Sequence, residues 1–103
     1  MSVIIIGGNE GMSAQYKKVC KEYNFDYKQY FKMPANNMKN KIGKPDLVIL
    51  FTSTISHKLM KSAISEADKN SVRVERVQNA STTALRNILE SYIFLNDKLD
   101  KAN

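Results

Sequence analysis

The residues of this chain that could bind or transform a ligand lie in two short polar segments. Residues 7–11 and 52–57 each follow directly on a run of apolar residues. Glycines let the backbone approach a ligand closely, and free amides at the start of a following helix favour an anion such as phosphate or carboxylate. The expected contacts are the backbone amides of Gly7, Gly8 and Asn9 and the hydroxyls of Thr52, Ser53 and Ser56.

The spacing of these residues leaves a purely structural interpretation open. It matches neither the dinucleotide-binding pattern G-x-G-x-x-G nor the phosphate-loop pattern G-x-x-x-x-G-K-[ST]. A tight turn from a strand into a helix needs glycine in any case, and hydroxyls before a helix usually cap its first amides. Ser81, Thr82 and Thr83, at the start of the last predicted helix, either cap that helix or form a third wall of the same pocket.

His57 is the only histidine, and the pattern places it in the first turn of a helix. There the helix dipole favours the neutral imidazole, which can exchange hydrogen bonds or ligate a metal or haem iron. A lone histidine is often only a surface or packed residue. The neighbouring Ser56 does not aim at it and no acidic partner for a triad is evident, which disfavours nucleophilic hydrolysis. Glu10 is the one carboxylate candidate for a second proton-transfer group.

The counts of cysteine and histidine exclude several classes of protein. One cysteine and one histidine cannot make an internal disulfide, a zinc finger or a histidine-rich metal site. Cys20 lies on the apolar stripe of a predicted helix, so we expect a core residue and not a nucleophile. No apolar stretch approaches the roughly 20 residues of a membrane span, and no signal-peptide pattern is present. We expect a cytoplasmic protein with no membrane partner.

The positive charge of the chain is concentrated in one segment. The net charge is +6, and residues 17–44 alone contain eight lysines and two carboxylates. All cations there are lysine, whereas base reading and bidentate phosphate binding favour arginine. The segment is either a solvated surface or a face that attracts anions, with Lys32 and Lys39 as candidates to steer a charged ligand. Nucleic acid is a weaker alternative partner.

The apolar periodicity predicts an alternation of strands and helices. Residues 3–6 and 47–51 are continuous apolar runs, which suits strands buried on both faces. Residues 26–31 and 72–77 mix polar with apolar residues, as edge strands do. Helices are predicted over residues 12–23, from residue 56 to 69 and from residue 82 onward, with a short helical turn at residues 38–42.

This alternation predicts a single α/β domain over residues 1–103, with a four-stranded parallel sheet and helices on both faces. Right-handed crossovers and central positions for the two wholly apolar strands give the order 2-1-3-4. Such a sheet opens a crevice at the carboxyl ends of its first and third strands, where the two polar segments meet. The apolar face of the last helix, which includes Leu95 and Leu99, is broader than one sheet contact requires, so we expect a homodimer through this helix.

Three short motifs together resemble a known family. They are Val-Ile-Ile-Ile-Gly-Gly at residues 3–8, the segment from Asp46 through Leu50 and Thr52 to Ile55-Ser56-His57, and the Ser81-Thr82 turn. The combination resembles the uncharacterised bacterial family known as domain of unknown function 2325. The resemblance implies a small Rossmann-like domain without an established activity. It places the family's polar positions at Gly7, Gly8, Ser56, His57 and Ser81.

Two classes of function fit these observations, and a third is retained. The first is a non-catalytic module that binds or senses a small anionic ligand, such as a nucleotide, and acts as a homodimer. The second is an enzyme acting on a phosphorylated or nucleotide substrate with His57 as general acid or base. The third is a nucleic-acid accessory protein that uses the lysine-rich segment. The sequence identifies no cofactor.

Overall fold

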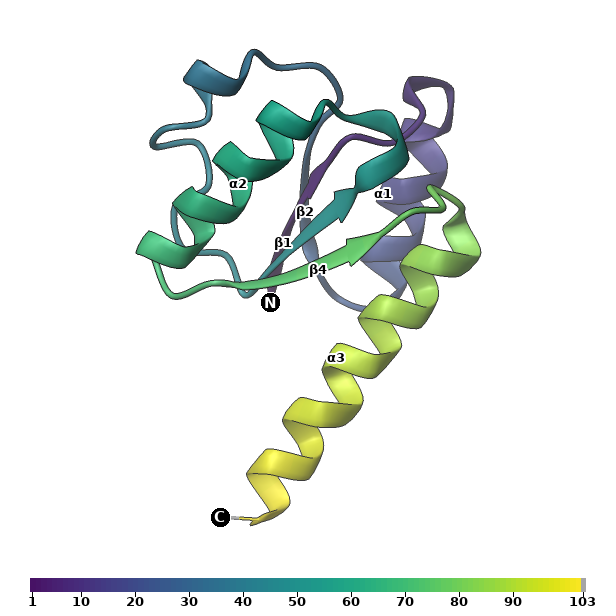
Figure 1. The fold of residues 1–103 in the computed structure, drawn as a ribbon. Helices are drawn as coiled ribbons and strands as arrows, with labels where there is room; N and C mark the ends of the chain where they lie inside the picture. The colour runs from purple at the N-terminus through teal and green to yellow at the C-terminus, as the bar shows by residue number, and fades with distance from the viewer. Residues whose placement is uncertain (103) are drawn as a thin grey trace.

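The structure, a computed structural model, describes the backbone of residues 1–102 and the side chains of residues 1–97. It contains a four-stranded sheet in which all neighbouring strands are parallel and the order is β2-β1-β3-β4. The predicted α/β fold and strand order are therefore confirmed (Figure 1). The strands are β1 (Ser2–Ile6), β2 (Asp26–Tyr30), β3 (Leu47–Phe51) and β4 (Arg73–Val77), and the helices are α1 (Ser13–Glu22), α2 (His57–Lys69) and α3 (Thr82–Ala102).

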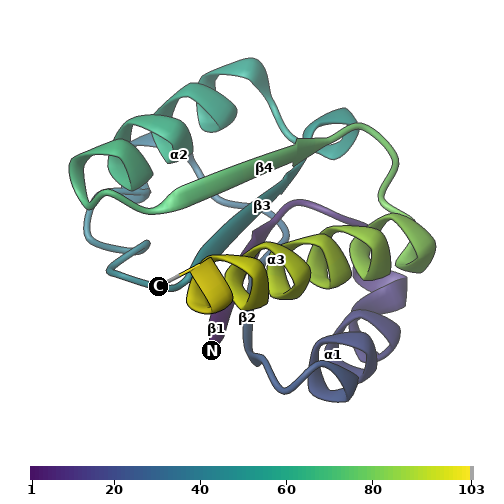
Figure 2. The same cartoon turned by 90° about the horizontal axis from the view of Figure 1, so that it is seen from below.

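The two central strands are apolar throughout because each face of the sheet is covered by its own layer of helices. Successive side chains of a strand point to opposite faces. Val3 and Ile5 pack with α1 and α3, whereas Ile4 and Ile6 pack with α2. Seen from below, the sheet lies between α2 on one side and α1 with α3 on the other (Figure 2).

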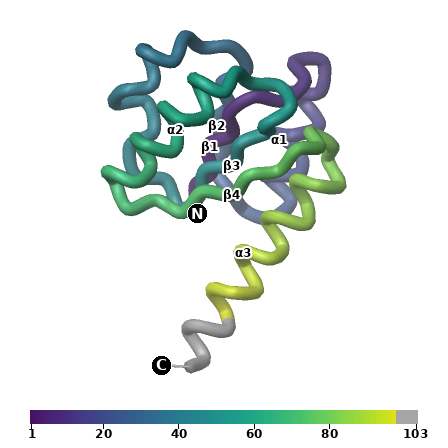
Figure 3. The backbone as a smooth tube through the Cα atoms, viewed as in Figure 1, coloured from purple at the N-terminus to yellow at the C-terminus, as the bar shows by residue number. Residues whose placement is uncertain are grey.

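The connection between β2 and β3 differs from the predicted helical turn at residues 38–42. The only helical segment there is a 3-10 turn, η2, at Ala35–Asn37. Met38 and Ile42 are buried beneath α2, but Asn40 and Gly43 have φ angles of 65° and 61°, which end any helix. The connection instead runs beside α2 (Figure 3), where the Ser62 hydroxyl donates a 2.8 Å hydrogen bond to the Ala35 carbonyl.

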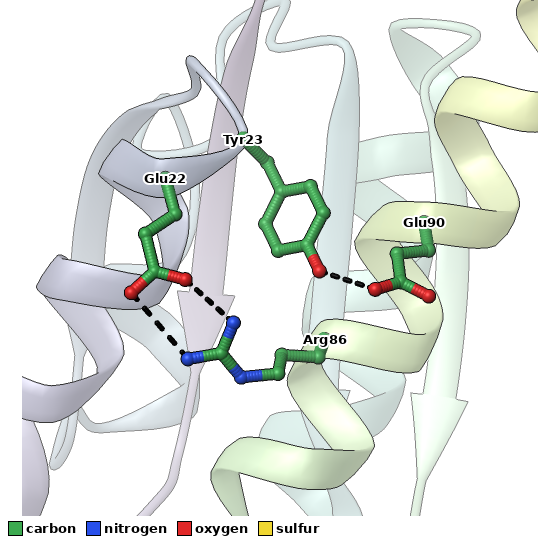
Figure 4. A network of polar contacts seen from close by, with 4 residues as sticks. All are labelled: Glu22, Tyr23, Arg86 and Glu90. Atoms are coloured by element: carbon green, nitrogen blue, oxygen red, sulfur yellow. Dashed lines mark hydrogen bonds and ion pairs between the residues drawn. The ribbon is translucent and has the colours of Figure 1, made fainter.

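Polar side chains join α1 to α3 at the surface (Figure 4). The Arg86 guanidinium donates hydrogen bonds of 2.5 and 3.4 Å to the two carboxylate oxygens of Glu22, and the Tyr23 hydroxyl donates to Glu90. The hydrogen bond from Arg86 is the main cause that lowers the pKa of the Glu22 carboxyl. Two helices far apart in the sequence are thus tied together on one face of the sheet.

Helix α3 begins against the sheet and then runs on past the amino ends of the strands (Figure 1). Leu85 and Leu89 are fully buried, whereas Phe94 is 65% exposed and Leu95 is 38% exposed. The side chain of Leu99, part of the predicted apolar face, lies outside the described residues. Within the part of the chain that the structure describes, no helix is long and apolar enough to cross a membrane.

Candidate functional site

The glycine segment after β1 makes a tight approach to the segment after β3. Gly7 and Gly8 have φ angles of 90° and 101°, a region that side chains disfavour. A Cβ on Gly7 would lie 2.5 Å from the Thr54 hydroxyl oxygen and 2.6 Å from the Ile55 side chain. A Cβ on Gly8 would lie 2.7 Å from the Gln29 amide nitrogen. Gly7 is therefore required by the meeting of the two loops, and Gly8 by the close approach of Gln29 from β2.

The three amides expected to contact a ligand instead donate hydrogen bonds to acceptors within the chain. The Gly7 amide donates to the Tyr30 carbonyl at 2.8 Å, continuing the pairing of β1 with β2. The Gly8 amide donates to the Thr54 hydroxyl at 2.7 Å, and the Asn9 amide donates to the Tyr16 hydroxyl at 3.1 Å. A ligand at these amides would have to compete with the three internal bonds.

Tyr16 and Gln29 also hold the loops in place, although the sequence pattern assigned neither of them to the site. The Tyr16 hydroxyl donates a 2.6 Å hydrogen bond to the Ala80 carbonyl, just before α3. The Gln29 amide donates a 2.8 Å hydrogen bond to the Gly7 carbonyl. Tyr16 occupies an apolar position of α1 and is fully buried, so its hydroxyl was the only sign in the sequence that it could form these hydrogen bonds.

The hydroxyls after β3 also form hydrogen bonds within the chain. Ser53 donates to the Gln78 carbonyl at 2.6 Å, and Thr52 lies 3.5 Å from the Val77 carbonyl. Thr54 donates to the Phe51 carbonyl at 2.8 Å while it accepts from the glycine loop. Hydrogen bonds therefore join the loop after β3 to the loop after β1 on one side and to the end of β4 and the residue after it on the other.

Ser56 and Ser81 both cap helices, as the structural interpretation predicted. The Ser56 hydroxyl accepts a 3.0 Å hydrogen bond from the Leu59 amide of α2. The Ser81 hydroxyl accepts a 3.0 Å hydrogen bond from the Ala84 amide of α3. Thr82, the first residue of α3, lines a shallow groove between α1 and α3 together with Gln15, Lys18, Val19 and Arg86.

His57 is the first residue of α2 and its side chain is exposed. Among the described residues, no side chain or carbonyl forms a hydrogen bond with its imidazole, and the His57 and Lys58 amides have no acceptor. Glu10 forms an ion pair with Lys32 at 3.8 Å and not with His57. The described residues contain no group of three or more histidine, cysteine, aspartate or glutamate side chains able to hold a metal.

Other features of the chain lie away from this edge. A hollow of about 420 Å³ lies between the amino ends of β1 and β2 and the 40–45 connection, and another of about 530 Å³ lies on the outer surface of α1. Cys20 is fully buried, and burial raises the pKa of its thiol to about 12. The cysteine is a core residue, as the apolar stripe predicted.

The comparisons with known proteins give a family but no characterised relative. A family model described as "Uncharacterized protein conserved in bacteria", domain of unknown function 2325, matches residues 2–92. No curated protein matches the chain, and no solved structure matches it.

Proposed function

The chain belongs to the bacterial family known as domain of unknown function 2325, and we propose that it is a non-catalytic module that binds a small anionic ligand, such as a nucleotide, at the carboxyl edge of its sheet. The observation behind this proposal is the joining of three loops there. Gly8 is hydrogen-bonded to Thr54, Ser53 to Gln78, and Tyr16 to Ala80. Three loops held together by hydrogen bonds in this way lose little conformational entropy when a ligand binds.

The groups available to a ligand at this edge are those that the chain leaves free. Among the described residues these groups include the imidazole of His57, the amides of His57 and Lys58 at the start of α2, and the carboxamide nitrogen of Asn9. The start of a 13-residue helix favours an anion through its free amides and its dipole. The cap formed by Ser56 fixes the direction of these amides. Gly7 and Gly8 shape the wall of the site without giving up their own amide bonds.

Binding is favoured over catalysis because no described residue is a partner of His57 for proton transfer. General acid–base catalysis needs a positioned second group or a bound water that moves a proton at the reacting atom. The carboxylate suggested by the sequence, Glu10, forms an ion pair with Lys32. The enzyme remains the alternative, and the test below distinguishes it.

The test is a thermal-shift series with inorganic phosphate, ATP, glucose 6-phosphate and haem on the native protein and on His57→Gln. A ligand at ten times its Kd adds about 1.4 kcal/mol of stability by mass action. For a domain of this size that raises the Tm by roughly 5–10 °C. We expect at least one phosphate compound to shift the native protein and His57→Gln to lose at least half of the shift.

Ser65→Ala, at an exposed position of the same helix, is the matched control and should keep the full shift. Shifts of equal size in His57→Gln and the native protein would place the ligand elsewhere and overturn the proposal, as would the absence of any shift. Conversion of the added nucleotide or sugar phosphate, detected by chromatography and abolished in His57→Gln, would instead establish the enzyme.

A homodimer through α3 is the second part of the proposal. Phe94 and Leu95 border a hollow of about 380 Å³ that Glu90 and Ser91 complete on the outer side of the helix. In a two-fold dimer the same patch of each chain meets itself. A protruding aromatic ring beside a hollow is therefore complementary to a second copy of the same helix. Each Phe94 would fill the hollow of the other chain.

A further inference from the structure

The hollow at the amino ends of β1 and β2 contains side chains of opposite charge. Its volume is about 420 Å³, within the roughly 300–1,000 Å³ of small-molecule sites. Asp26 and Lys28 line it from β2, and Lys41 lines it from the connection between β2 and β3. Lys28 pairs in register with Ile4, which packs on the α2 face of the sheet. Since alternate residues of a strand share a face, Asp26 and Lys28 both lie on that face, beside Lys41.

The three charged side chains of this hollow are exposed and are not paired with one another. The ion pairs found among the described residues all involve other side chains. The Cα atoms of Asp26 and Lys28, two residues apart on one strand, are separated by roughly 6.5 Å. One carboxylate and two ammonium groups are therefore available, within one hollow, to a ligand that carries the opposite charges.

The backbone of Tyr27 adds a donor and an acceptor to the hollow. The Asp26 amide donates to the Met1 carbonyl at 2.8 Å, so Asp26 directs its backbone groups toward β1. These groups alternate in direction along a strand, so Tyr27, the next residue, directs its N–H and C=O to the open edge of the sheet. The Tyr27 side chain packs on the opposite face with α1 and α3. The part of Tyr27 that lines the hollow is therefore its backbone.

The connection that forms the other wall of the hollow is fixed to the sheet and is partly apolar. The Asp46 carboxylate accepts a 2.7 Å hydrogen bond from the Ser2 amide, and the Asp46 amide donates to the Ser2 carbonyl at 3.0 Å. Ile42 and Pro45 of the connection both line the hollow, and Ile42 is anchored in the core. The wall thus offers an apolar surface next to the charged groups.

We propose that this hollow binds a free α-amino acid with an apolar side chain, such as leucine. The ammonium group of the ligand pairs with Asp26, and its carboxylate pairs with Lys28 and Lys41. Its side chain lies against Ile42 and Pro45. An α-amino acid carries both charges on one carbon, which suits a carboxylate and ammonium groups that line one hollow without contacting each other. A phosphate compound offers no cation to Asp26.

The test follows amide chemical shifts in heteronuclear NMR titrations of the whole chain with leucine. We expect a Kd below about 1 mM, with the Tyr27 amide among those that shift. Three analogues each lack one of the groups that the hollow recognises: isocaproate lacks the ammonium, isoamylamine lacks the carboxylate, and glycine lacks the side chain. Each should bind at least about 10-fold more weakly, because the omitted group leaves its partner in the hollow without a contact.

Variants of the charged residues should respond differently to leucine and its analogues. Asp26→Asn should weaken leucine binding at least about 10-fold and leave isocaproate binding unchanged, since isocaproate has no ammonium group for Asp26. Lys28→Gln/Lys41→Gln should likewise weaken leucine binding and leave isoamylamine binding unchanged. Asp68→Asn makes the same change of charge as Asp26→Asn at an exposed position of α2 and should bind leucine like the native protein. His57→Gln should also bind leucine normally, because the hollow lies at the other end of the strands.

Four results would overturn the proposal. The first is no shift at about 20 mM leucine, where a site with a Kd of about 1 mM is about 95% occupied. The second is equal affinity for leucine and isocaproate, which would make the hollow a site for carboxylates in general. The third is unchanged leucine binding in Asp26→Asn, or a loss that Asp68→Asn shares. The fourth is a set of shifts confined to the carboxyl ends of the strands, which would place leucine in the His57 site.

Discussion

The hydroxyl of Tyr16 on α1 joins the loop after β1 to the loop after β4, since it accepts from the Asn9 amide and donates to the Ala80 carbonyl. The Asn9 amide and the Ala80 carbonyl therefore meet at one oxygen atom, and the tyrosine that carries this oxygen is fully buried. A core side chain thus sets the position of two surface loops. Removal of this one oxygen should therefore destabilise both loops.

Replacing Tyr16 with phenylalanine keeps the ring and leaves the Asn9 amide and the Ala80 carbonyl without their partner. The loss should cost about 1–3 kcal/mol of the free energy of unfolding. Urea denaturation followed by circular dichroism measures it. Tyr92→Phe is the control, because the Tyr92 ring is partly buried and its hydroxyl bonds to no described residue, so its cost should stay below about 0.5 kcal/mol. Equal costs in the two variants would contradict the joining function of Tyr16.

Gly8→Ala should destabilise the domain through both conformation and space. The positive φ of 101° strains any side chain, and the new Cβ would meet Gln29 and the rings of Phe51 and Tyr16. Strain and overpacking together should cost roughly 3 kcal/mol. Gly43→Ala is the matched control, since Gly43 also has a positive φ but has open space around its Cβ position. It should cost only about 1 kcal/mol, and a Gly8→Ala cost no larger than this would show that Gln29, Phe51 and Tyr16 can move to make room for the new side chain.

The ion pair of Glu22 with Arg86 should make stability depend on pH in the acidic range. Its hydrogen bond with Arg86 lowers the pKa of Glu22 in the folded protein, so the unfolded chain takes up a proton first as the pH falls. The stabilisation is therefore complete above the ordinary glutamate pKa of about 4.3 and is lost as the pH falls through the lowered folded value. In a double-mutant cycle of Glu22→Gln and Arg86→Gln, the coupling in Tm should be present at pH 7 and absent well below pH 4. A coupling that is constant over this range would contradict the assignment.

Phe94→Glu should turn the proposed dimer into a monomer. A charge at this position, which is 65% exposed in the single chain, would be buried without a partner in the two-fold contact. Light scattering at 50 μM protein should give twice the 11.7 kDa chain mass for the native protein and a single chain mass for the variant. Ser65→Glu on α2 adds the same charge away from α3 and should stay dimeric. A monomeric native protein would show that the prediction of a dimer is wrong.

The strand order could be predicted because burial on two faces leaves a strong pattern. Residues 3–6 and 47–51 contain no polar residue, and only central strands of a sheet covered on both faces need that. The β2–β3 connection could not be predicted in the same way. The apolar Met38 and Ile42 are four residues apart, as in a helix, but they are buried from an irregular segment that Asn40 and Gly43 bend.

The meeting of the two polar loops followed from the sequence, but their hydrogen bonding did not. The meeting of the loops after β1 and β3 follows from the strand order alone. The Gly8 and Asn9 amides donate hydrogen bonds to the hydroxyls of Thr54 and Tyr16, which belong to other elements of the fold. Such partners leave no periodicity in the sequence, and Tyr16 shows in the pattern only as one more apolar position. Capping by Ser56 and Ser81 was predictable because a cap and its helix are neighbours in the chain.

The burial of Leu85 and Leu89 against the sheet bears on how the domain forms during synthesis. These residues of α3 complete the cluster that also contains Val3 and Ile5 of the first strand. A nascent chain that ends before α3 therefore has only α1 on this face of its sheet, and the apolar side chains that α3 would cover are free to attract other chains or chaperones. This core cluster, which begins with the first strand, is complete only when α3 has left the ribosome.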